Sequence, residues 1–310
     1  MIRVVRRTDS GIQVLDGPAP RGDGVRVRVT SAGICGTDLH ALGSGASPVV
    51  LGHEFGGLLD DGSLVAVQPY VPCGECAACR RGEEQLCPAT RDFRGATRDG
   101  GLADEVLVDP RALVPIPAGV DPAAVSLVEP IAVAVHAINR ARLQPGERAL
   151  VIGGGSIGLL CAAVLADRGA SVDVLARHPA QRAAAEAMGV GDTATGRYSL
   201  VVDAAGTGSS ADQAVRAAEH GGRLVLVALP WEAASYGIAL VLKEITVVPA
   251  IYYGRDGGIR EFGQAADFLG RHPALPGVLV THRFPLEQAA EAFRIAGDRA
   301  SGAIKVTLQP

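Results

Sequence analysis

The chain has 310 residues, 48% of them hydrophobic, and a formal net charge of −4. This length is enough for two domains that each bury a sizeable core. The acidic balance excludes a basic surface of the kind that binds nucleic acid or an anionic membrane. The first residues, MIRVVRRTDSGIQV, lack the apolar centre of a signal peptide, and the longest apolar stretch, 157–166, is too short to span a bilayer. We therefore expect a cytoplasmic globular protein.

Short β-rich runs such as VRVRVTSAG and SLVAVQPYV, separated by Gly and Pro, fill the first 120 residues and predict an irregular, barrel-like domain. Three segments carry possible metal ligands. Two lie in this region, GICGTDLH with Cys35 and LGHEFGG with His53 and Glu54, and the third, LVEPIAVAVHA with Glu129, follows it. A mixed set of thiolate, imidazole and carboxylate is typical of a catalytic zinc, which keeps one coordination position open. Taken singly, a Cys or His is more often a packing residue and a Glu a solvated one.

Four cysteines lie between these segments in VPCGECAACRRGEEQLC, at Cys73, Cys76, Cys79 and Cys87. The spacing lets all four thiolates turn toward one tetrahedral Zn²⁺ at about 2.3 Å. Four protein ligands leave no open position, so the sequence predicts a structural zinc. The alternative is a pair of disulfides, which a reducing compartment disfavours.

The second half of the chain alternates apolar strands with helical patterns: ALVIGG, SVDVLA, LVVDAAG, RLVLVAL and ITVVPAI. Such alternation predicts a doubly wound α/β parallel sheet. A G-x-G-x-x-G turn follows the first of these strands and opens a helix, an arrangement that binds the pyrophosphate of a dinucleotide on the helix N-terminus. The alternative is a simple Gly-rich turn. The residues that we expect to bind the cofactor here are Gly153, Gly155, Ser156, Ile157 and Gly158.

The end of the next strand, in SVDVLARHPAQR, distinguishes the two nicotinamide dinucleotides. An acid there, about 20 residues past the glycines, binds the ribose 2′-hydroxyl of NAD, whereas a 2′-phosphate requires no acid and a nearby Arg. We align this position with Ala176, followed by Arg177 and, one helical turn on, Arg182. The sequence therefore favours NADP(H) over NAD(H). The competing candidate is Asp173, three residues earlier within the strand.

Together, GICGTDLH, GHE, the four-Cys segment, DGGLADEVLV, VEPIAVAVHA, VIGGGSIG and the terminal SGAIKVTL resemble the zinc-dependent medium-chain alcohol dehydrogenases, in particular their sorbitol and threonine dehydrogenase-like branch. The resemblance implies a discontinuous GroES-like catalytic domain over 1–122 and 252–310, with a zinc lobe at about 70–90. It implies a Rossmann cofactor domain over 123–251. It also implies two zinc ions per chain and a homodimer or homotetramer.

The resemblance further assigns roles within these motifs. Cys35 and His53 would bind the catalytic zinc, Glu129 would complete the site directly or through water, and Glu54 would exchange onto the metal. Thr37 matches a hydroxyl that touches the substrate oxygen, His40 a proton relay, and Asp38 a carboxylate that orients the ligand histidine. Lys305 matches a residue that reaches the cofactor phosphates, although a solvated surface position is the alternative.

The chemistry implied is the transfer of a hydride between a small-molecule secondary alcohol and the nicotinamide, with zinc as Lewis acid. We expect the substrate pocket around Leu42, Phe93 and Tyr252. The polar loop TRDFRGATR favours a polyol, cyclitol or amino alcohol. Two alternatives stay open: a catalytically silent NADPH-binding sensor or structural relative, and a reductase of C=C or C=N bonds.

Overall fold

The computed structural model describes residues 1–40, 47–191, 194–230 and 233–310. The chain forms two compact units, one made of Met1–Glu129 and Gly254–Pro310, the other of Pro130–Tyr253. The first unit is discontinuous in sequence, and its two segments join in one sheet. The second is a single continuous stretch.

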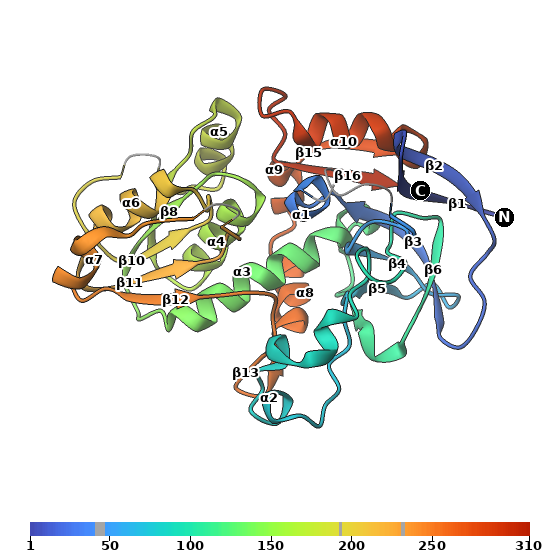
Figure 1. The fold of residues 1–310 in the computed structure, drawn as a ribbon, viewed down its shortest axis with the longest axis horizontal. Coiled ribbons are helices and arrows are strands. Elements are labelled where there is room, and N and C mark those ends of the chain that lie inside the picture. The colour runs from blue at the N-terminus through green and yellow to red at the C-terminus, as the bar shows by residue number, and fades with distance from the viewer. Residues whose placement is uncertain (41–46, 192–193, 231–232) are drawn as a thin grey trace. The chain divides into compact units, whose positions relative to one another are not determined.

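The first unit is built on a seven-stranded sheet in the order β15-β16-β3-β4-β5-β7, with β6 also paired to β3 (Figure 1). The long strand β3 pairs with β6 through Val25–Arg28 and with β16 through Ala32–Gly33. Its alternating valines face a core that includes Phe55 and Leu308. The strands are β3 (Val25–Gly33), β4 (Glu54–Leu58), β5 (Leu64–Val67), β6 (Glu105–Val108), β7 (Leu113–Pro115), β15 (Val280–Pro285) and β16 (Lys305–Gln309).

Smaller elements complete this unit. Two hairpins are formed by β1 (Ile2–Thr8) with β2 (Gly11–Gly17) and by β13 (Arg255–Asp256) with β14 (Ile259–Arg260). The α-helices are α1 (Gly36–His40), α2 (Ala77–Arg80), α8 (Glu261–Arg271), α9 (Leu275–Leu279) and α10 (Ala289–Gly297). Single 3-10 turns occur at η2 (Glu84–Leu86), η3 (Pro88–Arg91), η4 (Pro110–Ala112), η5 (Pro122–Leu127) and η6 (Leu286–Gln288).

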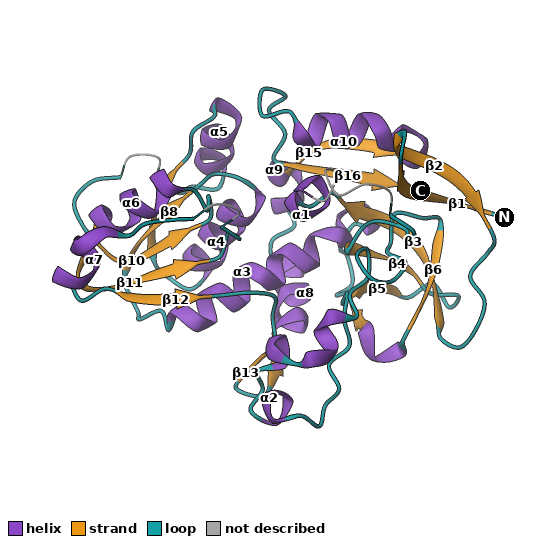
Figure 2. Ribbon diagram, viewed as in Figure 1, coloured by secondary structure: helices purple, strands orange, loops and turns teal. Residues whose placement is uncertain are grey.

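The second unit is a five-stranded parallel sheet in the order β12-β11-β10-β8-β9, with helices between successive strands (Figure 2). This confirms the predicted doubly wound sheet. The strand sequences are continuous apolar runs because helices cover both faces of a parallel sheet. The elements are β8 (Arg148–Ile152), α4 (Ser156–Asp167), β9 (Ser171–Leu175), α5 (Pro179–Ala187), β10 (Tyr198–Asp203), α6 (Gly208–Ala217), β11 (Ala218–Leu226), α7 (Gly237–Leu242) and β12 (Thr246–Pro249).

Beyond β9, the described residues add a bridge at Gly191 to this sheet. Gly191 exchanges backbone hydrogen bonds with β9, donating to Val172 O at 3.0 Å and accepting from Val174 N at 2.7 Å. With Gly191 counted as the third strand position, the sheet has the order 3-2-1-4-5-6 of dinucleotide-binding folds. The chain order therefore reverses between β8 and β10, where such folds bind their ligand.

Helix α3 (Val128–Ala141) follows η5 directly. In the described part of the chain, the stretch Pro122–Ala141 is the one helical segment long and apolar enough to cross a membrane. However, 78% of its most apolar window is buried inside the protein. This is the burial of a core helix.

Candidate functional site

The structure brings together Cys35, His53 and Glu54, whose ligand atoms all lie within 4.8 Å of one another. Cys35 lies between β3 and α1, and His53 immediately precedes β4. Because β3 and β4 are antiparallel with Gly33 opposite Glu54, the residues after one strand and before the other meet at the same edge. The strand register thus assembles the three side chains that the sequence places in two motifs.

Asp38 holds this cluster from α1. Its Oδ2 accepts a hydrogen bond from Cys35 N at 2.9 Å, and its Oδ1 lies 3.5 Å from His53 Nδ1. Asp38 and His53 are both buried. Burial acts to lower the pKa of His53, but the charges of Asp38 and Cys35 outweigh this effect and raise the pKa well above its ordinary value.

The other residues predicted for this site occupy different environments. Glu129, at the start of α3, is buried at 6% exposure but lies outside the group of three defined above. Thr37 and His40 are exposed on α1, and Thr37 Oγ1 lies 3.8 Å from Cys35 Sγ. The ring of Phe93 lies 5.4 Å from the His53 imidazole and 6.0 Å from Tyr70, so Phe93 borders the cluster.

Two pocket residues are not placed beside the cluster. Leu42 lies outside the described residues, and Tyr252 belongs to the second unit.

The position of Lys305 differs from one of the two expectations for it. The alternative of a solvated surface residue is wrong, because the Lys305 side chain is only 4% exposed. Its Nζ donates to both carboxylate oxygens of Glu54, at 2.8 and 2.7 Å. Burial acts to lower the pKa of Lys305, yet the negative charges of Glu54 and Cys35 raise it. The contact between Lys305 and Glu54 was not predicted from the sequence. The one indication of it is that Lys305 lies within the apolar strand IKVTL, where a charged side chain needs a buried partner.

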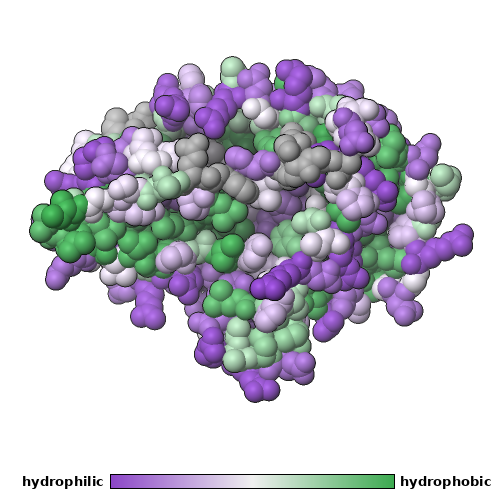
Figure 3. All heavy atoms as spheres, viewed as in Figure 1, coloured by the Kyte–Doolittle hydropathy of each residue, from purple (hydrophilic) through white to green (hydrophobic). Residues whose placement is uncertain are grey.

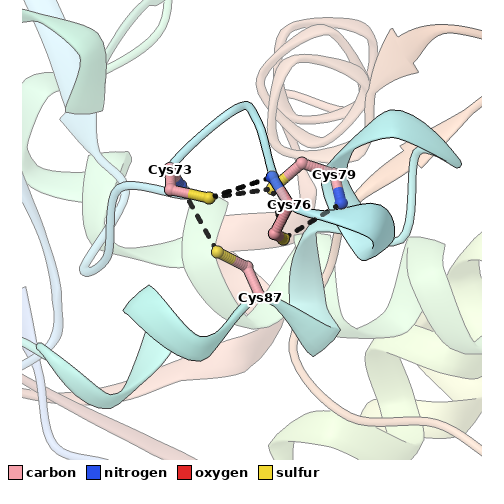
Figure 4. Close-up of side chains that lie close together, drawn as sticks. All are labelled: Cys73, Cys76, Cys79 and Cys87. Carbon is pink, nitrogen blue, oxygen red and sulfur yellow. Dashed lines mark hydrogen bonds between the residues drawn. The ribbon is translucent and has the colours of Figure 1, made fainter.

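The four remaining predicted zinc ligands converge in one lobe (Figure 4). Cys76 Sγ lies 3.5 Å from Cys79 Sγ, and Cys73 Sγ lies 4.0 Å from Cys79 Sγ. These separations bracket the roughly 3.8 Å between sulfurs of a tetrahedral Zn–S₄ centre. They are too long for a disulfide bond of about 2.05 Å, and all six cysteines of the chain are free. The pair of disulfides is therefore wrong.

Backbone amides in the lobe donate hydrogen bonds to the cysteine sulfurs, which stabilises the thiolate form. Cys73 Sγ accepts from Cys76 N at 3.4 Å and Cys87 Sγ from Cys73 N at 3.3 Å. The amides of Glu75 and Cys76 lower the pKa of the Cys73 thiol to about 7. Donor type, number and arrangement thus all fit a closed zinc site.

The glycine-rich turn of the second unit fits a dinucleotide. Gly153 has φ +109°, and a Cβ on Gly158 would lie 1.8 Å from Gly153 O, so neither position accepts a side chain. Gly155 caps α4, whose first turn carries no acid. The Ser156 hydroxyl is buried without a hydrogen-bond partner among the described residues. The helix start therefore presents free N–H groups and one hydroxyl donor, with Ile157 in the same turn.

The end of β9 lies directly against this turn. A Cβ on Gly154 would lie 2.7 Å from Ala176 Cβ, and Gly153 N donates to Leu175 O at 3.0 Å. Arg177 is exposed, whereas Arg182 Nη1 donates to Arg177 O at 2.9 Å and to Ala176 O at 3.4 Å. The competing residue, Asp173, accepts instead from Tyr198 OH at 2.7 Å, within the strand.

Family models match both parts of the chain. The alcohol dehydrogenase GroES-like domain matches residues 21–118, and the glucose dehydrogenase C-terminus matches 122–309. L-Galactonate-5-dehydrogenase of Escherichia coli K12 is 32% identical over 307 residues, which cover 89% of this chain and 88% of the relative. Galactitol 1-phosphate 5-dehydrogenase of the same organism is 30% identical and covers all of both chains.

Solved structures agree with this assignment. The crystal structure of galactitol-1-phosphate dehydrogenase from Escherichia coli superposes with a TM-score of 0.89 at 28% identity, over 100% of both chains. A structure described as a zinc-binding dehydrogenase from Sinorhizobium meliloti 1021 bound to NADP superposes with a TM-score of 0.86 at 27% identity, over 100% of this chain and 99% of the other. The chain belongs to the zinc-dependent medium-chain alcohol dehydrogenases, oxidoreductases that join a GroES-like domain to a Rossmann-type domain for a nicotinamide cofactor.

Proposed function

We propose that this enzyme oxidises a polar secondary alcohol, such as a polyol or a sugar acid, with NADP⁺, and catalyses the reverse reduction of the ketone. The observation that carries the proposal is the buried cluster of Cys35, His53 and Glu54, with Asp38 against it. The proposed catalytic domain is 1–122 with 252–310, and the proposed cofactor domain is 123–251. These bounds lie within a few residues of the two compact units, which divide after Glu129 and after Tyr253.

Two zinc ions per chain are part of this proposal. Cys73, Cys76, Cys79 and Cys87 would hold a structural ion, and Cys35 and His53 with a carboxylate of Glu54 or Glu129 would hold a catalytic one. When bound, the catalytic zinc supplies a Lewis acid for the alcohol oxygen, and the nicotinamide supplies the hydride acceptor.

The chain's own residues then have to position the alcohol and remove its proton. Asp38 fixes the imidazole of His53 through its contact with Nδ1. The hydroxyl of Thr37, close to Cys35 Sγ, is placed to accept the proton of an alcohol that approaches the cluster. His40, exposed at the end of α1, would pass this proton to solvent, a task that suits imidazole because its ordinary pKa lies near neutrality.

The substrate class rests on relatives and on one loop. L-Galactonate, galactitol 1-phosphate and L-idonate dehydrogenases all act, by name, on polyhydroxylated compounds. The loop at 90–98, which carries Phe93 beside His53, is rich in Arg, Asp and Thr. Such side chains offer hydrogen-bond partners to several hydroxyl groups.

The preference for NADP⁺ rests on Ala176 and Arg177. No acid occupies the position after β9, and the exposed guanidinium of Arg177 is available for a 2′-phosphate. Such a charge-assisted contact is worth about 1.5 to 3 kcal/mol, or roughly ten- to a hundredfold in affinity. We expect Ala176→Asp with Arg177→Leu to raise the KM for NADP⁺ and lower that for NAD⁺, with little change in kcat. A parent enzyme that uses NAD⁺ at least as well as NADP⁺ would contradict this assignment.

A homo-oligomer in the cytoplasm completes the proposal. Helix α7, which precedes the edge strand β12, carries three exposed apolar side chains, Ile238 (74% exposed), Val241 (69%) and Leu242 (69%). Figure 3 shows where hydrophobic residues gather on one face of the molecule. Exposed apolar surface next to an open sheet edge favours pairing with a second copy. The six free cysteines are compatible with a reducing compartment.

The test is a substrate screen of the purified enzyme with NADP⁺ and NAD⁺ across polyols, sugar acids, cyclitols and amino alcohols, together with zinc analysis. We expect turnover of a polyhydroxylated secondary alcohol and loss of one zinc in Cys35→Ser. Tight NADPH binding without turnover would support a silent sensor instead. Reduction of only C=C or C=N substrates would indicate the other alternative.

A further inference from the structure

The Glu54 carboxylate has a buried cationic partner, Lys305. Both of its oxygens accept from Lys305 Nζ, which also donates to Ile34 O at 3.3 Å. The ammonium group therefore uses three contacts, which matches its three protons. With exposures of 1% and 4%, neither side chain of the pair is solvated. Each depends on the other for its charge to be balanced.

A glycine leaves room for the carboxylate. A Cβ on Gly33 would lie 2.1 Å from Glu54 Oε2. Gly33 is extended strand backbone, directly opposite Glu54, so its conformation does not itself require glycine. The requirement comes from the position of the carboxylate, and a side chain at Gly33 would displace it.

Glu54 remains within 4.8 Å of the ligand atoms of Cys35 and His53. A metal at that cluster and Lys305 are thus rival partners for one carboxylate. We propose that Lys305 and Gly33 form a holding site that keeps Glu54 off the catalytic metal, so that Lys305 is a positioning residue that sets the number of ligands. This inference rests on the zinc site proposed above. It leaves Glu129 as the third protein ligand.

The direction in which loss of Lys305 changes zinc affinity distinguishes a holding site from a residue that orients a metal ligand. A residue that orients a metal ligand strengthens metal binding, and its loss typically weakens affinity by about 10- to 100-fold. A residue that withholds a ligand has the opposite effect. Once Lys305 is replaced by an uncharged side chain, the buried carboxylate has only the metal as a partner.

The experiment uses the zinc-loaded enzyme and its cobalt-substituted form. In Lys305→Met, we expect zinc release from the Cys35 and His53 site to a chelator to slow by about tenfold. The visible d–d bands of Co²⁺ at this site should weaken, because their intensity falls as the coordination number rises. Lys305→Arg, which keeps the charge, should resemble the parent. Gly33→Ala should resemble Lys305→Met by displacing the carboxylate while the lysine is intact.

A double variant supplies the control. Removal of a positive charge near Zn²⁺ can slow release by electrostatics alone. The step from Glu54→Gln to Lys305→Met with Glu54→Gln contains the same charge loss but has no carboxylate to move. We expect these two variants to share one release rate and one cobalt spectrum. Unchanged or faster release in Lys305→Met, or equal slowing of release by Lys305→Met in the parent and in Glu54→Gln, would overturn the holding site. Retention of both zinc ions by Cys35→Ser would instead overturn the catalytic zinc site itself.

Discussion

Asp38 uses its two carboxylate oxygens on two different members of the metal cluster, Cys35 N and His53 Nδ1. An amide cannot replace it. In Asp38→Asn, the NH₂ group would face either the Cys35 N–H or the protonated His53 Nδ1, which places two donors together. We expect catalytic zinc affinity, measured by chelator competition, to fall by about 10- to 100-fold. Asp61→Asn, in an exposed turn of the same unit, should leave the affinity unchanged.

His40 is the residue whose loss should depend most on pH. In His40→Ala, alcohol oxidation should slow chiefly at low pH, where solvent hydroxide is too scarce to substitute, by at most about 10²- to 10⁴-fold. The measurement is the pH profile of kcat/KM. His282→Ala, which removes an imidazole from β15, serves as the control. A His40→Ala profile parallel to that of the parent would show that the proton leaves by another route.

Arg3 and Asp104 form the ion pair with the clearest pH consequence. Burial acts to raise the pKa of Asp104, but hydrogen bonds from the Arg3 side chain and backbone outweigh it and lower the pKa below 3.8. A lowered carboxyl pKa stabilises the fold above the unfolded-state value, and this stability is lost as the pH falls through the folded-state value. Arg3→Met should therefore cost about 1 kcal/mol at pH 7. In urea unfolding, the difference from the parent should shrink as the pH falls below the ordinary pKa of an aspartate.

A side-chain network joins β9 to β8, β10 and the segment before β10. Tyr198 OH donates to Asp173 Oδ2 and accepts from Thr195 N at 2.9 Å, while Arg148 lies over the Tyr198 ring at 4.7 Å. A Cβ on Gly191 would lie 2.1 Å from Asp173 Oδ1, so the backbone of Gly191 packs closely on the same carboxylate.

Loss of one hydroxyl should weaken this network measurably. Tyr198→Phe removes the acceptor of the Thr195 amide and leaves the Asp173 carboxylate with the more distant Arg148 contact of 3.4 Å. This should reduce the free energy of unfolding by about 1 to 3 kcal/mol. Urea unfolding of the whole enzyme checks this, and Tyr236→Phe is the matched control on the same unit. An equal loss in both variants would argue against a special role for the network.

The sequence predicted the elements that carry short-range signals. The parallel sheet followed from apolar runs and helices, and the four-cysteine site from residue spacing. The site of Cys35, His53 and Glu54 followed from its mixed set of possible ligands and from the family resemblance of its motifs. Contacts that depend on register across distant strands were not predictable in this way. Whether Lys305 faces Glu54 is decided by the pairing of β16 with β3, and a shift of one residue would turn its side chain to the other face of the sheet.

At the scale of the whole molecule, the apolar face of α7 gives the clearest prediction. Leu242→Asp places a charge among Ile238, Val241 and the edge of β12. We expect the assembly to shift to a smaller species in size-exclusion chromatography with light scattering. Val108→Ala, a buried change in the first unit, should not alter the oligomeric state. An unchanged mass in Leu242→Asp would place the subunit contact elsewhere.

The division of the first unit between two distant segments also sets an order of events during synthesis. The second unit is complete once Tyr253 has left the ribosome, whereas the first still lacks β15, α10 and β16, which supply Phe293 and Leu308 to its core. Since domains fold as units as the chain emerges, the nucleotide-binding unit can fold while the metal-binding unit waits. Lys305 is made after every other residue of its cluster, so Glu54 gains its counter-charge only after the second unit has been synthesised.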